Sequence, residues 1–134
     1  MTQYRISEAA ALLGVSDDTL RRWVASGSLT ATQDAGGRQV IDGADLAARA
    51  ANIAVTPENP LGAGSSARNR FVGLVTAITS DKVMSQVELQ CGPHRVVSLM
   101  STEAVRDLRL EIGSLAVAVV KATTVIVETP QAGR

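Results

Sequence analysis

The spacing of hydrophobic residues divides this chain into two parts. In the first part, apolar residues recur three to four positions apart, as on the buried face of a helix. In the second part, Val and Ile alternate with polar residues, as in a half-buried strand. The stretch between them is rich in Pro, Gly and Ser, which is typical of a linker. We therefore predict a mainly helical domain over residues 1–51, a linker over 52–65, an all-β domain over 66–129 and a frayed tail over 130–134.

Two successive helices are predicted near the N-terminus. Ser7 and Ser16 are placed to cap them, because a serine hydroxyl can accept a backbone N–H of the first helical turn. Gly14 would end the first helix, and Ser26-Gly27 the second. The face of the second helix that we expect to be buried carries Leu20, Trp23 and Val24.

A short hairpin and a third helix are predicted to follow. Leu29–Gln33 and Arg38–Ile41 flank the turn-forming residues Asp34–Gly37, a pattern typical of a β-hairpin. Asp42 would then begin a helix that runs through Ala50. Two helices joined by a short turn, with a hairpin behind them, indicate a winged helix-turn-helix domain.

The motif SxxTLRRWxxxGxL, at residues 16–29, resembles the core of the MerR/excisionase-type winged helix. In that family the second helix enters the major groove of DNA and the hairpin wing contacts the phosphate backbone. The resemblance therefore implies double-stranded DNA as a partner. The implied DNA-contacting residues are Ser16, Thr19, Arg21 and Arg22 on the helix, and Gly37 and Arg38 on the wing.

The predicted DNA-binding face departs from the family in its charge. The wing carries one cation, Arg38, and Asp17 and Asp18 lie close to the face that would approach phosphate. Because phosphate contacts supply most of the non-specific affinity for DNA, we expect a single copy to bind weakly. In the alternative interpretation, Arg21 and Arg22 form a solvated helix face and the domain mediates protein contacts only.

Four ordered motifs in the second part resemble the Mop or molbindin domain, also called the TOBE domain. They are SARNRFVGLVTAI at 66–78, KVMSQVEL at 82–89, LMSTEAVRDLRLEIG at 99–113 and VAVVKATTVIV at 117–127. The resemblance implies a β-barrel of the oligonucleotide/oligosaccharide-binding type with one short helix. It also implies that the domain binds molybdate or tungstate in sites shared between subunits.

The resemblance assigns the oxyanion-binding residues as well. One subunit would contribute Ser66, Ala67, Arg68, Asn69, Lys121, Ala122 and Thr123, and its neighbour would contribute Ser101. Molybdate oxygens only accept hydrogen bonds, so clustered donors of this kind suit the anion. Where the family has a second hydroxyl, three residues after Ser101, this chain has Ala104, and Thr102 or a water is a candidate replacement.

The cations of this predicted site also have a purely structural interpretation. Arg68 and Lys121 could pair with carboxylates such as Glu103 or Glu128 in a domain that binds no ligand. A buried cation needs either an anion or a carboxylate as a partner, and both alternatives satisfy that need.

Little in the sequence favours catalysis or a structural metal. Cys91 and His94 flank a predicted turn, and two ligands are too few for a structural zinc site. With one His and one Cys, the chain offers no constellation of titratable groups suited to catalysis, and we predict that it is not an enzyme.

The composition limits which cellular location and which partners are expected for the protein. The formal net charge is zero and no segment is strongly basic, so DNA binding would need a localised patch or a multimer. We find no signal-peptide pattern and no apolar run long enough to span a membrane, and the single Cys fits a reducing compartment. The cytoplasm is therefore the expected location.

Our leading hypothesis is a molybdate-responsive transcriptional regulator. The resemblance implies a homo-oligomer, expected to be a hexamer built as a trimer of dimers with exchanged strands, because one Mop copy cannot form a two-domain unit alone. One alternative is a molybdate storage or homeostasis protein whose winged helix does not regulate transcription. Another is a structural partner protein without a ligand.

Overall fold

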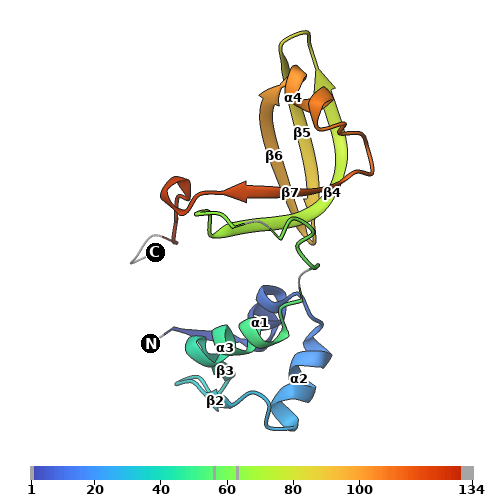
Figure 1. The fold of residues 1–134 in the computed structure, drawn as a ribbon. Coiled ribbons are helices and arrows are strands. Elements are labelled where there is room, and N and C mark those ends of the chain that lie inside the picture. Colours follow the sequence, from blue (N-terminus) through green and yellow to red (C-terminus); the bar gives the residue numbers. More distant parts are fainter. Residues whose placement is uncertain (1, 56, 63, 131–134) are drawn as a thin grey trace. The chain divides into compact units, whose positions relative to one another are not determined.

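The computed structural model describes residues 2–55, 57–62 and 64–130 (Figure 1). The chain divides into two compact units, Met1–Val55 and Thr56–Arg134, and each has its own hydrophobic core. No helix in the described ranges is long and apolar enough to cross a membrane, and the longest has 11 residues. Most of the predicted tail, 131–134, lies outside the described residues.

The first unit has three helices and a small antiparallel sheet. Its strands follow the order β1-β3-β2, and β1 was not predicted from the sequence. The elements are β1 (Gln3–Arg5), α1 (Ile6–Leu13), α2 (Asp17–Ala25), β2 (Ala31–Gln33), β3 (Gln39–Asp42) and α3 (Gly43–Ile53). The prediction of a mainly helical helix-turn-helix domain with a hairpin is confirmed.

Two of the three predicted helix starts are observed. The hydroxyl of Ser16 accepts the Thr19 N–H at the start of α2, and the Asp42 carboxylate accepts the Asp45 N–H at the start of α3. The prediction for Ser7 was wrong, because α1 already begins at Ile6. The Glu8 carboxylate accepts the Arg5 N–H at 3.1 Å, so the chain turns into the helix two residues earlier than predicted.

The core of the first unit contains Leu20 of the predicted face, which is fully buried. Trp23 and Val24 are half-buried and pack against this core, and the guanidinium of Arg49 lies 4.4 Å above the Trp23 ring. Trp23 thus covers the edge of the core and stacks with a cation, which agrees only in part with its predicted core position. The buried cluster is Ile6, Ala9, Ala10, Leu20, Leu29, Ile41 and Leu46.

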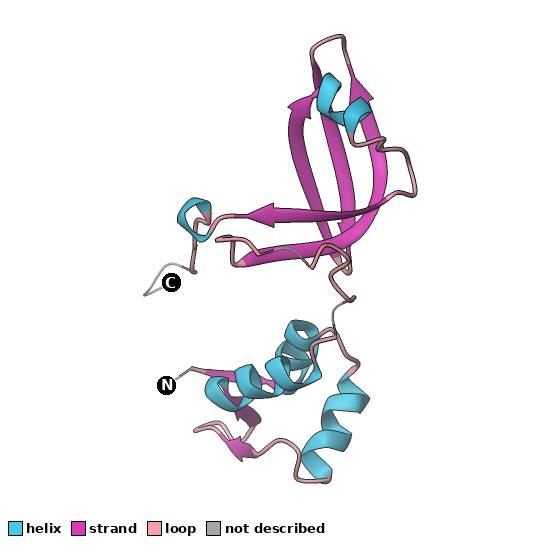
Figure 2. Cartoon of the chain, viewed as in Figure 1, coloured by secondary structure: helices cyan, strands magenta, loops and turns pink. Residues whose placement is uncertain are grey.

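The second unit is a four-stranded antiparallel sheet with one α-helix and one 3₁₀ turn (Figure 2). Its strands follow the order β6-β5-β4-β7. The elements are β4 (Asn69–Ser80), β5 (Met84–Cys91), β6 (His94–Ser101), α4 (Thr102–Asp107), β7 (Leu115–Val120) and the turn η1 (Ala122–Thr124).

Strand β4 changes partners along its length. Its first half pairs with β7 and its second half with β5, and the register with β5 shifts between Val75 and Ala77. Figure 1 shows the resulting bend, with β7 beside one part of β4 and β5 beside the other, and β6 on the far side of β5. The sheet is therefore a half-barrel, which confirms the predicted all-β fold of the oligonucleotide/oligosaccharide-binding type with one short helix.

Strand β5 alternates as predicted. Ser85, Val87 and Leu89 are buried, whereas Val83 precedes the strand and is exposed, so it does not extend this face. The predicted turn is the two-residue connection between Cys91 and His94, where Gly92 has a φ of 60° that suits glycine. In one copy of the chain, residues 125–130 form no regular structure, although the fourth family motif extends through Val127.

Candidate functional site

The paired ends of β4 and β7 bring together residues that are about fifty positions apart in the sequence. Asn69 pairs with Val120, and its side-chain Nδ2 donates a hydrogen bond to the Val120 carbonyl at 3.2 Å. The ladder ends at this pair, and Arg68 and Lys121 are the residues that directly flank it along the chain. The predicted SARN and KAT residues thus meet at one end of the domain.

The backbone around these residues is held by short turns. The Lys121 carbonyl accepts both the N–H and the hydroxyl of Thr124, at 3.0 and 2.8 Å. The hydroxyl of Ser65 accepts the Ala67 N–H at 3.1 Å, so this N–H, one of the predicted anion donors, already has a partner in one copy. Ser66, Arg68, Lys121, Ala122 and Thr123 are exposed, and Asn69 is half-buried.

Neither Arg68 nor Lys121 forms an ion pair with a carboxylate among the described residues. The two ion pairs between described residues are Arg21 with Asp18 and Arg95 with Glu88. The alternative pairing of Arg68 or Lys121 with Glu103 or Glu128 is therefore absent in one copy. Two cations without a neutralising carboxylate leave local positive charge at this end of the domain.

Ser101 lies at the start of α4 and is exposed. Its hydroxyl oxygen accepts the Ala104 N–H at 3.0 Å, and its hydroxyl hydrogen is still available to donate. Ala104 itself offers no side-chain donor. The exposed hydroxyl of Ser101 can therefore donate a hydrogen bond to a ligand outside this copy.

Thr102 cannot replace the hydroxyl that Ala104 lacks. Its Oγ1 donates to the Asp81 carbonyl at 2.8 Å and lies 2.8 Å from the Ser85 hydroxyl, which in turn lies 2.7 Å from that of Ser80. Ser85 is fully buried, so these hydroxyls form an internal network that joins α4 to β4 and β5. The Thr102 alternative raised by the sequence was wrong for this reason.

The Arg68–Lys121 end and the Ser101 end do not meet within one copy. Strand β4 begins at Asn69 and ends at Ser80. The hydroxyl network connects Thr102, the residue after Ser101, to the Ser80 end through Ser85. Figure 1 shows α4 and η1 at separate ends of the unit. A site that uses both ends needs two copies of the chain.

A pocket of about 510 Å³ opens beside Ser101. It carries two cations and two carboxylates, and none of these forms an ion pair with another described residue. The residues that line it are Lys82, Val83, Ser101, Glu103, Arg106 and Asp107.

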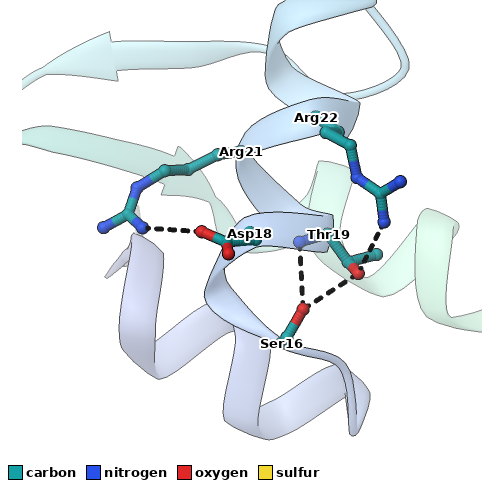
Figure 3. Close-up of polar contacts among 5 residues, drawn as sticks. All are labelled: Ser16, Asp18, Thr19, Arg21 and Arg22. Carbon is teal, nitrogen blue, oxygen red and sulfur yellow. Dashed lines mark hydrogen bonds and ion pairs between the residues drawn. The ribbon is translucent and has the colours of Figure 1, made fainter.

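Three of the four DNA-contacting residues predicted around α2 form a connected polar group (Figure 3). Thr19 Oγ1 accepts hydrogen bonds from the Ser16 hydroxyl at 3.0 Å and from Arg22 Nη2 at 3.1 Å. Arg21 points to the other side, where its Nη1 lies 3.6 Å from the carboxylate of Asp18. Both arginines are exposed, but the charge of Arg21 is partly neutralised.

The wing turn is ordered by Asp34. Its carboxylate accepts the N–H groups of Gly36 and Arg38, each at 2.9 Å. Gly37 has a φ of 77°, a conformation that side chains disfavour, so the turn requires glycine there. Gly37 and Arg38 are exposed on this turn, as contact with the phosphate backbone of DNA would require.

Asp81 and Ser85 were not singled out from the sequence. The Asp81 carboxylate accepts the N–H groups of Val83 and Met84 at 2.7 and 2.8 Å, and these bonds hold its pKa below the usual value. An Asp followed by two residues and a strand is a recognisable turn pattern, whereas the buried role of Ser85 needs the fold. In the described ranges, no three His, Cys, Asp or Glu residues are grouped as a metal site would need.

Comparison with known proteins follows the division of the chain. A family model described as the TOBE domain matches residues 65–127, and one described as a helix-turn-helix domain matches residues 4–53. A probable molybdenum-pterin-binding protein of Haemophilus influenzae is 41% identical over 63 residues, which are 46% of this chain and 91% of the relative. The chain belongs to the TOBE family. It joins a TOBE domain to a helix-turn-helix domain.

Two further relatives are longer than the matched part. The molybdenum transport protein ModE of Herbaspirillum seropedicae is 40% identical over 70 residues, which are 52% of this chain but only 26% of ModE. The solved structure of the cytoplasmic molybdate-binding protein ModG, with molybdate bound, is 34% identical with a TM-score of 0.50. It aligns with 57% of this chain, and this chain spans 55% of it.

Proposed function

We propose that this chain binds molybdate, or the similar tungstate, between copies of its TOBE domain and regulates transcription through its helix-turn-helix domain. It is a binding protein and not an enzyme, and it acts in the cytoplasm. The two domains are joined by the linker, which begins after Ile53 and not at residue 52 as predicted, because α3 runs through Ile53. The choice of ligand is supported by the relatives, which are named as molybdenum transport, molybdenum-pterin-binding or molybdate-binding proteins.

The observation that carries the proposal is the pairing of Asn69 with Val120, because Arg68 and Lys121 directly flank this pair and neither forms an ion pair with another described residue. A dianion would neutralise both, and the adjoining donors would complete its shell. These donors are Ser66, Asn69, Ala122 and Thr123, the N–H of Ala67 once it is released from Ser65, and Ser101 supplied by the neighbouring copy. Hydrogen bonds from charged donors contribute about 1.5–3 kcal/mol each, enough to hold a small anion with a few contacts.

The partner copy is supported by the apolar surface of the TOBE domain. In one copy, many large side chains on the sheet, after α4 and beyond η1 are exposed, more than a monomeric domain of this size normally leaves open. They include Leu74, Leu99, Leu108, Ile112, Leu115 and Ile126. We infer a homo-oligomer, a hexamer arranged as a trimer of dimers, in which these residues become buried.

Regulation would follow from linkage between the two kinds of domain. An anion shared between copies favours one arrangement of subunits, and that arrangement sets the spacing of the helix-turn-helix domains on DNA. The anion can change DNA affinity only as far as it discriminates between subunit arrangements. On DNA, the contacts would come from Ser16, Thr19, Arg21 and Arg22 in α2, and from Gly37 and Arg38 in the wing.

Calorimetric titration of the full chain with molybdate, tungstate and sulfate tests the ligand. We expect saturable binding of molybdate and tungstate in an oligomer measured by light scattering. A monomer at micromolar concentration, or no heat with molybdate, would remove the intersubunit site. Titration of DNA at fixed salt, with and without molybdate, then tests regulation.

Storage of molybdate is the second candidate, and one observation favours it. Arg21 is paired with Asp18, and Asp17 and Asp18 are exposed at the start of α2, so the surface that would face phosphate is only weakly cationic. Equal DNA affinity with and without molybdate, together with tight oxyanion binding, would support storage over regulation.

A further inference from the structure

The pocket beside Ser101 contains a cation that the proposed oxyanion site has not used. Lys82 lies at the tip of the turn between β4 and β5, and it lines the same pocket as Ser101. It is exposed and forms no ion pair with another described residue. Its ammonium group is therefore available to a ligand that approaches Ser101.

The turn that carries Lys82 is fixed relative to Ser101. Within the turn, the Asp81 carboxylate accepts the N–H groups of Val83 and Met84, and the Asp81 N–H donates to the Met84 carbonyl at 2.9 Å. Thr102 then joins the turn to α4, because its N–H donates to the Val83 carbonyl and its hydroxyl to the Asp81 carbonyl, both at 2.8 Å. These bonds hold the backbone of Lys82 close to Ser101, which directly precedes Thr102.

The charge around the pocket decides what Lys82 can do. Lys82 and Arg106 are balanced by Glu103 and Asp107, so the pocket alone has no net charge with which to hold a dianion. The end of another copy that carries Arg68 and Lys121 would add two positive charges. Lys82 then matters, because with it the two ends together carry two net positive charges, which match the dianion, and without it they carry only one.

We propose that Lys82 is an additional ligand of the shared oxyanion, donated by the same copy as Ser101 and standing in for the hydroxyl that Ala104 lacks. The inference rests on the proposed molybdate site. Lysine presents three donors on a flexible stem and can reach an oxygen from the tip of the turn. Glu103, on the first turn of α4, opposes binding from the same pocket.

Titration of three variants with sodium molybdate at fixed salt tests this assignment. Lys82→Gln should weaken binding on the order of tenfold, as expected when a charged donor is lost. Glu103→Gln should tighten binding, because it removes a negative charge from the pocket. Arg109→Gln is the matched control, since Arg109 is an exposed cation outside the pocket lining. The molybdate affinity of this variant should equal that of the wild type.

The outcomes separate this inference from the proposed function. Wild-type protein that does not bind molybdate overturns both. Wild-type protein that binds, with Lys82→Gln equal to Arg109→Gln, overturns the role of Lys82 alone. The role is also overturned if Glu103→Gln dissociates the oligomer in light scattering without tightening binding, because the carboxylate would then pair with the partner's cations. Unchanged melting of Lys82→Gln excludes a folding defect as the cause of weaker binding.

Discussion

The backbone of β4 at Gly73 lies directly against Cys91 at the end of β5. A Cβ at position 73 would lie 2.6 Å from the Cys91 Sγ and closer still to the Gln90 carbonyl oxygen, which is backbone and cannot move aside alone. This close approach occurs just where β4 passes from β7 to β5. Glycine at 73 therefore allows the bend that shapes the half-barrel.

Gly73→Ala should destabilise the TOBE domain by roughly 1–3 kcal/mol, the usual result of inserting a methyl group into a closely packed region. Chemical denaturation of the full chain measures the difference. Gly64→Ala is the matched control, because a Cβ there meets nothing within 4 Å and the backbone is not in the left-handed region. Equal stability of the two variants would show that β4 and β5 separate easily at this point.

The Asp81 carboxylate predicts a pH dependence of stability. Its pKa is lowered in the folded chain by the N–H groups of Met84 and Val83, so its contribution is fully present above the unfolded value of about 3.9. The contribution is lost as the pH falls through the lower folded pKa. Asp81→Asn should thus melt earlier than the wild type at pH 7, and the gap should shrink below about pH 4. Thermal melts of both proteins between pH 7 and pH 3 measure this difference. A difference in melting temperature that stays constant with pH would contradict a role for the Asp81 charge.

Lys121→Ala distinguishes an anion site from a structural ion pair. We expect oxyanion binding to weaken by about 1.5–3 kcal/mol, while the ligand-free protein keeps or slightly gains stability, because a cation that has no counterion among the described residues is removed. If Lys121 were instead paired with a buried carboxylate in the oligomer, its loss would cost about 3–5 kcal/mol of stability. Melting temperature and molybdate affinity, measured on the same variant, decide between the two. A variant that melts much earlier yet binds molybdate normally would show that the assignment is wrong.

Local patterns predicted most of the helices and strands. Ser16 and Asp42 cap their helices as expected, because a cap needs only the neighbouring residues. Ser7 failed because Glu8 offered a competing bond to Arg5, and the choice between the two depends on how β1 enters the sheet. The alternation in β5 was likewise readable, whereas the change of partners along β4 was not.

The candidate site was predicted only as far as the family motifs reach. The motifs located Arg68, Lys121 and Ser101, but no local pattern shows that they lie at different ends of β4 in one copy. The sequence also offered Thr102 as a free hydroxyl, and its bond to Asp81, 21 positions away, depends on tertiary structure. For the same reason the position of Lys82 beside Ser101 became visible only in the folded domain.

The most direct test of a shared oxyanion site is a molybdate titration of mixed oligomers. Lys121→Ala and Ser101→Ala chains, each with its own tag, would be produced together, and oligomers containing both would be isolated. If each site takes Lys121 from one copy and Ser101 from another, a fraction of the mixed sites contains both native residues. Those sites should bind molybdate with wild-type affinity, although oligomers of either variant alone bind weakly. Mixed oligomers that bind as weakly as the single variants at every site would contradict a site formed between copies.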